Sequence, residues 1–367
     1  MLIGIDCHTL EKTKTGVARY LTNLLKNWKG IKGVNFIFYS MNSVKNPLNI
    51  KSTILYYNFS LSRQAKKDKV DILFLPFYMR PFFCKVPTAV AIHDISYIAH
   101  PEWFNLYHRV AYRVLTERAI KKSEIIFACS EYTKQEILKY YPAKDGASRI
   151  DPEKIRVVLL AADEKFNNDK NQEKINETKH KHGIKDKYLF YVGSIFNRRH
   201  ILETIKAFVP ILDKHPDYQL LIGGRNLTNP YQDIDKEIKE INQKFTDAIR
   251  KTDYVSEEDM VYLYQGSDLF IYLSEYEGFG LPPLEAMACG TPVLTTKMTS
   301  LKEVIGDYPL WVENPNNVEE IKVKITKVLD DENFKNELIN KGLERAKQFS
   351  WRKAAEETLK QLIGLNL

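Results

Sequence analysis

The chain has 367 residues, 44% of them hydrophobic, which is enough for about two packed domains. No apolar run reaches the roughly 18 residues of a membrane-spanning helix, and the N-terminus MLIGIDCHTL lacks the charged and apolar regions of a signal peptide. We therefore expect a cytoplasmic protein, at most peripheral to the inner face of a membrane, with its four cysteines reduced.

Charge is unevenly distributed along the chain. Residues 1–165 contain 26 Lys and Arg against 15 Asp and Glu, whereas the remaining residues contain 28 against 32, for a net charge of +7. A basic first half suggests an anionic partner, such as a membrane surface or a phosphorylated acceptor, and ordinary solvated lysines are the alternative. Basic charge is the only feature that favours nucleic acid, so we do not expect nucleic acid as a partner.

Strand-like and helix-like segments alternate along the whole chain, which predicts parallel α/β layers. The chain opens with a strand from Leu2 to Asp6, followed by an amphipathic helix whose apolar positions run from Val17 to Trp28 at helical spacing. Ser130 can cap a later helix. Further strands are expected in the first half at residues 35–40, 71–76, 88–94, 125–130 and 155–160.

The polar stretch from Asp163 to Asp186 predicts a connection between two domains, with some helix in it. A second alternating series follows. We expect two facing Rossmann-like domains, 1–165 and 166–349, with a ligand cleft at the carboxyl ends of their strands, and a closing helix at about 350–367 that packs back on the first domain. The second series has expected strands at 188–192, 219–223, 269–274, 292–296 and 310–313, and expected helices around 201–212, 234–245, 256–265 and 318–329.

The segment Glu275 to Thr296, EYEGFGLPPLEAMACGTPVLTT, combines features of a phosphate site. Gly278 and Gly280 let backbone amides approach a ligand, and the two prolines suit the first turn of a helix whose N-terminus favours phosphate. Glu277 and Glu285 flank this turn, and carboxylates accept hydrogen bonds from hydroxyls. The combination predicts a sugar–phosphate ligand, with an ordinary strand-to-helix turn as the alternative.

Two further turns offer groups for an anion. In YVGSIFNRRH, Arg198 and Arg199 stand between a strand and a helix, and tandem guanidinium groups match a diphosphate. In KTGVARY, Gly16 lies between the first strand and its helix, where amides are available to an anion. The alternatives are two surface arginines and a plain turn glycine.

Three other polar segments have candidate roles. His93 and Asp94 end the buried strand AVAIHDIS, so we expect them to point into the ligand crevice. The segment 77–85, FYMRPFFCK, mixes aromatic with basic residues and either touches lipid or a hydrophobic acceptor, or folds over its own core. Asp233 and Asp235 resemble a metal-binding pair but fit the start of a helix, so no metal site is expected.

These motifs together resemble glycosyltransferase family 4, the retaining enzymes of the two-domain GT-B fold. The resemblance spans nearly the whole chain and is closest to the mannosyltransferase-like branch of bacterial surface polysaccharide assembly. It includes the segments TGVARY, IHDISYIAHPEWF, ACSEYTKQEI, YVGSIFNRRH and EYEGFGLPPLEAMACGTPV. The family usually has an Arg-Lys pair where Arg198 and Arg199 stand.

The resemblance implies a role for each site residue. Glu277 would contact donor-sugar hydroxyls, and Glu285 would contact the ribose hydroxyls of the nucleotide. Gly16 would approach the diphosphate from the first domain, and His93 and Asp94 would lie beside the transferred sugar and the acceptor. The groups expected to hold the diphosphate are the amides of Phe279, Gly280 and Leu281, with Arg198 and Arg199.

The function implied by the resemblance is that of a retaining, metal-independent hexosyltransferase without a cofactor. The donor would be a nucleotide-diphosphate sugar, with GDP-mannose favoured by the branch, and the acceptor a glycan or a lipid-diphosphate-linked sugar. The alternatives are a sugar-nucleotide epimerase or a phosphorylase on the same fold, and an inactive scaffold subunit.

Overall fold

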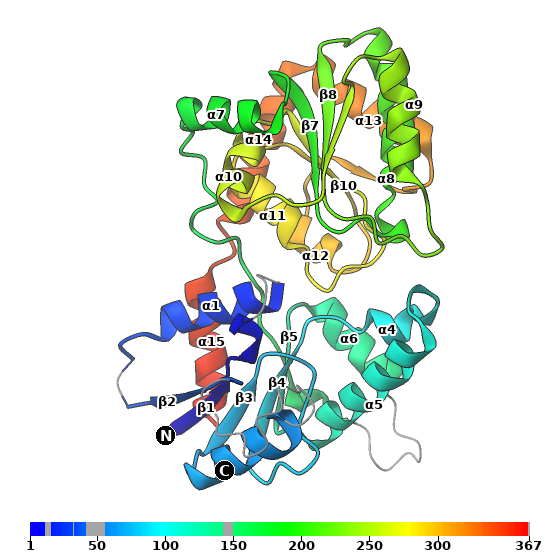
Figure 1. Cartoon of the computed structure of the whole chain (residues 1–367). Coiled ribbons are helices and arrows are strands. Elements are labelled where there is room, and N and C mark those ends of the chain that lie inside the picture. Colours follow the sequence, from blue (N-terminus) through cyan, green and yellow to red (C-terminus); the bar gives the residue numbers. More distant parts are fainter. Residues whose placement is uncertain (12–15, 32, 42–55, 142–149, 366–367) are drawn as a thin grey trace. The chain divides into compact units, whose positions relative to one another are not determined.

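The computed structural model describes residues 1–11, 16–31, 33–41, 56–141 and 150–365. The chain forms two compact units, Met1–Leu160 with Ser350–Leu367, and Ala161–Phe349 (Figure 1). Each unit contains one six-stranded parallel sheet with helices on its faces, which confirms the predicted Rossmann-like class. Lys14 and Thr15 of the predicted KTGVARY turn lie outside the described residues.

The sheet of the first unit has the strand order β2-β1-β3-β4-β5-β6. Its strands are short and almost continuously apolar because both faces of a parallel sheet are covered. They are β1 (Leu2–Asp6), β2 (Asn35–Tyr39), β3 (Ile72–Leu75), β4 (Thr88–Ile92), β5 (Ile125–Ala128) and β6 (Ile155–Val157). The helices are α1 (Gly16–Trp28), α3 (Ser62–Lys67), α4 (Ser96–Ala99), α5 (Leu106–Lys122), α6 (Glu131–Tyr140) and α15 (Trp351–Ile363), with the helical turns η1 (His8–Glu11), η2 (Tyr56–Leu61), η3 (Pro101–Trp103) and η4 (Pro152–Lys154).

Helix α15 packs against α1 in the first unit (Figure 1). The Trp28 indole donates its Nε1–H to the Ala355 carbonyl at 2.8 Å, and the Tyr20 and Trp351 rings lie 6.2 Å apart. The Trp28 ring also stacks on Phe36 of β2. The last helix of the chain therefore completes the core of the first unit through an aromatic contact and one directional hydrogen bond.

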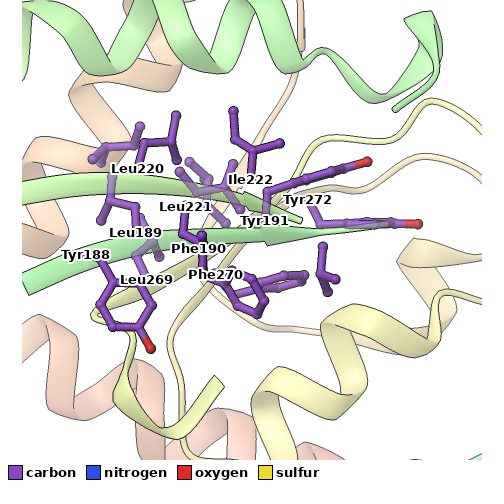
Figure 2. Packing of buried hydrophobic residues seen from close by; sticks show 14 of the residues in the cluster. Tyr188, Leu189, Phe190, Tyr191, Leu220, Leu221, Ile222, Leu269, Phe270 and Tyr272 are labelled. Carbon is purple, nitrogen blue, oxygen red and sulfur yellow. The ribbon is translucent and has the colours of Figure 1, made fainter. Parts of the chain in front are cut away.

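The second unit has the strand order β12-β11-β10-β7-β8-β9, with β7 beside both β10 and β8. Figure 2 shows its core, where Tyr191 of β7 and Tyr272 of β10 lie side by side, with ring centroids 6.0 Å apart. The strands are β7 (Lys187–Val192), β8 (Tyr218–Gly223), β9 (Ile249–Thr252), β10 (Leu269–Tyr272), β11 (Val293–Thr296) and β12 (Trp311–Val312). The helices are α7 (Gln172–His182), α8 (Ile201–Phe208), α9 (Ile234–Lys244), α10 (Glu257–Gly266), α11 (Leu281–Ala288), α12 (Leu301–Ile305), α13 (Val318–Asp330) and α14 (Glu332–Ala346), with η5 (Asn197–Arg199) and η6 (Val209–Asp213).

The stretch 163–186, expected as an interdomain connection, belongs to the second unit instead. Phe166 is buried and meets the ring of Tyr264 edge-on at 5.8 Å, while α7 buries Ile175 and packs on α10. The change of unit falls after Leu160, five residues before the expected boundary of 165. The polar sequence suggested a connection because most side chains of α7 are exposed to solvent. Only Ile175 and Thr178 of this helix are buried, and α7 packs on the second unit through them.

The contact between α1 and α15 leads to a stability prediction. Replacing Trp28, which is 2% exposed, by Phe removes the donor to the Ala355 carbonyl and leaves that acceptor buried without it. We expect Trp28→Phe to lower the free energy of unfolding by about 1–3 kcal/mol in urea titrations. Phe38→Leu, at an exposed position of β2, is the control and should change it by less than about 0.5 kcal/mol. Equal values for the two variants would show that this contact contributes little.

Candidate functional site

The segment 275–296 folds as predicted, with β10 before it, a loop, helix α11 and then β11. Gly280 is the N-cap of α11 and has φ 108°, a conformation that side chains other than glycine rarely adopt. A Cβ at this position would also lie 2.5 Å from the Leu301 side chain. Pro282 and Pro283 occupy the first turn, where a missing N–H costs nothing.

Glu277 is fixed by one of its two carboxylate oxygens. Its Oε1 accepts hydrogen bonds from the Tyr272 hydroxyl at 2.8 Å, from Ser274 Oγ at 2.9 Å, and from Arg199 Nε and Nη2 at 3.0 and 2.9 Å. Among the described residues, none donates a hydrogen bond to Oε2. The side chain is 15% exposed. The carboxylate is therefore held rigidly through Oε1 and keeps Oε2 available to a ligand.

The charge state of Glu277 follows from these contacts. Burial by itself would raise the pKa of the carboxyl group, but the positive charges of Arg199 and Arg198 and the hydrogen bonds from Tyr272 and Ser274 hold that pKa below its ordinary value. The group is thus ionised at neutral pH. An ionised carboxylate can only accept hydrogen bonds, so Oε2 suits a hydroxyl donor.

Arg199 lies in η5 and is directed towards Glu277 in this structure. Its Nη1 donates to the Ser194 carbonyl at 2.9 Å, and its guanidinium group lies 5.1 Å from the centre of the Tyr272 ring. Arg198 covers the Phe196 ring at 4.2 Å. Arg199 therefore positions the carboxylate, and its predicted contact with a diphosphate stays a prediction.

The amides at the start of α11 are available to an anion. Ser300 Oγ donates to the carbonyls of Glu277 and Phe279 at 2.7 and 2.9 Å. Within the described part of the chain, the N–H groups of Phe279, Gly280 and Leu281 donate to no acceptor. Free N–H groups at a helix N-terminus favour phosphate. This is the pattern predicted from the sequence, now combined with the open oxygen of Glu277.

Glu285 lies in the middle of α11 and is 1% exposed. Its Oε2 accepts a hydrogen bond from the Tyr264 hydroxyl at 3.3 Å. The structure thus places this second carboxylate beside α10, in the interior of the second unit. Its predicted contact with a ribose stays a prediction.

His200 was not predicted as a site residue, although it connects the two loops that carry Arg199 and Glu277. It is 5% exposed and has a left-handed backbone, with φ 48°. Its Nε2 lies 3.2 Å from a carboxylate oxygen of Glu275, and its Nδ1 lies 3.6 Å from one of Glu203. Burial lowers the pKa of this imidazole, but contacts with the two carboxylates outweigh burial and raise it to about 9. The only sign of these contacts in the sequence is that Glu203 stands three positions after His200, a spacing at which two side chains of a helix can meet.

Two of the three predicted residues of the first unit, His93 and Asp94, directly follow the carboxyl end of β4. His93 follows β4, has Nε2 3.0 Å from the Pro76 carbonyl, and has its pKa lowered by burial, so it is neutral. Asp94 accepts hydrogen bonds from the Ser96 amide at 2.9 Å and from Ser96 Oγ at 2.7 Å, which holds its carboxylate against the first residue of α4. Gly16 is the first residue of α1 and is exposed.

A second cluster of the first unit was missed by the sequence analysis. Asp6, at the end of β1, is fully buried and accepts hydrogen bonds from the hydroxyls of Tyr56 and Tyr57 and from His8 Nδ1 at 2.8 Å.

Among the described residues, no three His, Cys, Asp or Glu side chains are grouped as a metal site, and no helix is long and apolar enough to cross a membrane.

The ion pairs of His200 predict a pH dependence of stability. The two carboxylates raise the pKa of His200 in the folded state from its ordinary value of 6.5 to about 9, so protonation of His200 stabilises the native state. This contribution, up to about 3 kcal/mol, is complete below about pH 6.5 and is lost as the pH rises through about 9. We therefore expect His200→Gln to lower the free energy of unfolding, measured by urea titration, at pH 6. At pH 10 its free energy of unfolding should be close to that of the parent protein. His180→Gln, an exposed histidine of α7, is the control, and a pH-independent difference for His200→Gln would contradict the ion pairs.

Comparison with known proteins gives consistent results. The family described as "Glycosyl transferases group 1" matches residues 172–345. The O-antigen chain mannosyltransferase B of Escherichia coli is 31% identical over 277 residues, which cover 73% of this chain and 68% of that protein. The serotype-specific mannosyltransferase WbdA of Escherichia coli is 29% identical over 240 residues, but this match covers only 28% of its length.

The fold comparison covers both units. The crystal structure of Anabaena Alr3699/HepE in complex with UDP-glucose has a TM-score of 0.73 to this chain, at 16% identity, and the match covers 100% of both chains. The structure of WaaG, a glycosyltransferase involved in lipopolysaccharide biosynthesis, matches with a TM-score of 0.70 at 17% identity over 100% of both chains. The chain has the GT-B fold and belongs to the group 1 family of glycosyltransferases.

Proposed function

We propose that this protein is a retaining hexosyltransferase that moves mannose from GDP-mannose to a glycan or a lipid-diphosphate-linked acceptor in surface polysaccharide assembly. The observation that supports it best is the open Oε2 of Glu277 beside the free amides that start α11. This places a hydroxyl acceptor next to an anion site, as a sugar joined to a diphosphate requires. The mannosyltransferase relatives support the choice of sugar.

The proposed chemistry is electrostatic. As the bond between sugar and diphosphate breaks, negative charge develops on the leaving diphosphate, and the amides of Phe279, Gly280 and Leu281 with Arg198 neutralise it. Glu277 holds the sugar hydroxyls, and Glu285 binds the ribose. The departing phosphate takes the proton of the acceptor hydroxyl on the same face, so the configuration is retained and no metal or separate base is required.

The first unit is proposed to recognise the acceptor. Its residues Gly16, His93 and Asp94 take the diphosphate and acceptor contacts that the family resemblance implies. The unit contains 28 Lys and Arg against 15 Asp and Glu, an excess of 13 positive charges. Such an excess favours an anionic membrane, where a lipid-linked acceptor is found, so we propose that the enzyme acts at the cytoplasmic face of the membrane.

The role of Glu277 can be tested by separating turnover from binding. Glu277→Gln keeps the shape of the side chain but removes the charge that orients the sugar. We expect turnover to fall by about 10²–10³-fold, with nucleoside diphosphate affinity changed by less than about threefold. Glu332→Gln, an exposed carboxylate of α14, is the control. Unchanged turnover in Glu277→Gln would refute the assignment.

The donor can be identified by a thermal-shift screen against GDP-, UDP-, ADP- and dTDP-sugars. A ligand that binds the native state and not the unfolded state raises the melting temperature, and a tighter ligand raises it more. GDP-mannose, as the proposed donor, should therefore give the largest shift. Glu285→Gln should reduce that shift because it removes the ribose contact. A larger shift with another nucleotide would overturn the choice of GDP, and product formed without any acceptor would indicate an epimerase.

The metal-free mechanism predicts that EDTA leaves the transfer rate unchanged, since the charge on the leaving diphosphate is neutralised by protein groups. The measurement compares initial rates with EDTA and with added Mg²⁺ or Mn²⁺. Loss of activity in EDTA and its recovery with one of these ions would show that a metal takes part.

A further inference from the structure

The loop between β11 and α12 holds the glycine-rich loop, residues 277–280, by its backbone. Thr299 Oγ1 accepts a hydrogen bond from the Glu277 amide at 3.2 Å. The next residue, Ser300, donates its hydroxyl to the Glu277 carbonyl at 2.7 Å. Both backbone groups of Glu277 are therefore bound by two consecutive residues of one loop, while its carboxylate is held separately through Oε1.

The same loop also sets the direction of the Gly280 amide. In a trans peptide unit, the carbonyl of one residue and the N–H of the next point in opposite directions. Ser300 donates to the Phe279 carbonyl at 2.9 Å, so the Gly280 N–H points away from Ser300. The Leu301 side chain fills the space where a Cβ of Gly280 would lie. The start of α11 is thus held from the side opposite to its anion-binding amide.

Thr299 makes its contact from an unfavourable backbone conformation. Its φ is 52°, in the left-handed region, where a β-branched residue is a rare exception because its Cβ crowds the backbone. The other described non-glycine residues with positive φ are Lys69, His200 and Asp247, and none of them is β-branched. Such conformations persist where surrounding contacts impose them, and they concentrate at functional sites. Glycine would adopt this φ without strain, but it has no hydroxyl for the Glu277 amide.

We propose that Thr299 is a positioning residue for sugar transfer, whose hydroxyl fixes the backbone of Glu277 so that Oε2 stays in place for the donor sugar. The inference rests on the proposed function and adds a group that the family resemblance did not imply. Loss of the hydroxyl leaves the Glu277 amide without its acceptor and gives the loop freedom at the residue that carries the carboxylate. The charge of Glu277 and the amides of α11 are retained, so the loss affects orientation of the sugar more than binding of the nucleotide.

The kinetic test compares variants of the full chain with GDP-mannose as donor and an alkyl mannoside as acceptor. Thr299→Val keeps the size of the side chain and removes the hydroxyl, so it should lower kcat at least about tenfold and change the donor KM by less than about threefold. Thr299→Ser keeps the hydroxyl and should stay within about threefold of the parent kcat. The control is Thr358→Val, which removes a buried hydroxyl that donates to the Ala354 carbonyl in α15 and should leave both constants unchanged.

A double-mutant cycle separates positioning of Glu277 from a general structural effect. In the Glu277→Gln background, Thr299→Val should lower kcat by less than about a further twofold, because the residue through which Thr299 acts is already impaired. Fully additive losses would overturn the proposal. A Thr299→Val variant with unchanged kcat and a raised donor KM would also overturn it, since that result assigns Thr299 a direct contact with the donor.

Hydrogen exchange read by mass spectrometry tests the contact without any substrate. Thr299→Val should speed exchange at least about tenfold in peptides that contain the Glu277 amide, whereas Thr299→Ser and Thr358→Val should exchange like the parent protein there. Thermal melting establishes that each variant is folded. Unchanged exchange in Thr299→Val would overturn the positioning role. Faster exchange in this variant, together with no sugar transfer by the parent protein, would contradict the proposed function and still support the contact that positions Glu277.

Discussion

The pairing of Glu277 with Arg199 is the interaction on which the candidate site depends. The two residues are 78 positions apart and lie in two loops that follow different strands of one sheet. A buried carboxylate is costly unless a positive charge and hydrogen-bond donors accompany it, and here Arg199, Tyr272 and Ser274 all meet at Oε1. The arrangement concentrates these donors on one oxygen and keeps the other for a ligand.

Several weaker contacts hold the same two loops in fixed positions relative to each other. The Glu275 amide donates to the Arg198 carbonyl at 3.0 Å, and the His200 imidazole lies against the Glu275 carboxylate. Ser300 holds the carbonyls of the glycine-rich loop from the α12 side. The position of a functional group is fixed by the contacts that surround it. Without these contacts, the loop would allow the Glu277 side chain to adopt several conformations. The protonated state of His200 is part of this support, which links the geometry of the site to pH.

Local patterns predicted the parts of this site that lie within one segment. The glycines, the prolines and the spacing of Glu277 and Glu285 identified a strand, a loop and a helix N-terminus correctly, because the backbone requirements of such a turn are written in adjacent residues. The partner of Arg199 was not predictable, since side-chain direction depends on tertiary packing. Strand β9 was missed because Ile249–Thr252 is a short edge strand with two basic residues, and such strands lack the continuous apolar run of a central strand.

Helix α5 shows how a regular pattern can be hidden by a second one. A helix that packs on a core usually alternates one apolar and one polar face, and this alternation makes it recognisable in a sequence. In α5, the buried side ends in Ala119 and Ile120, while Leu106 and Val110 are exposed on another side, so apolar residues surround much of the axis and the alternation is weak. Folding explains only one of these faces. The exposed apolar groups have no role in the core of the first unit, and this is why a search for a single apolar face does not find this helix.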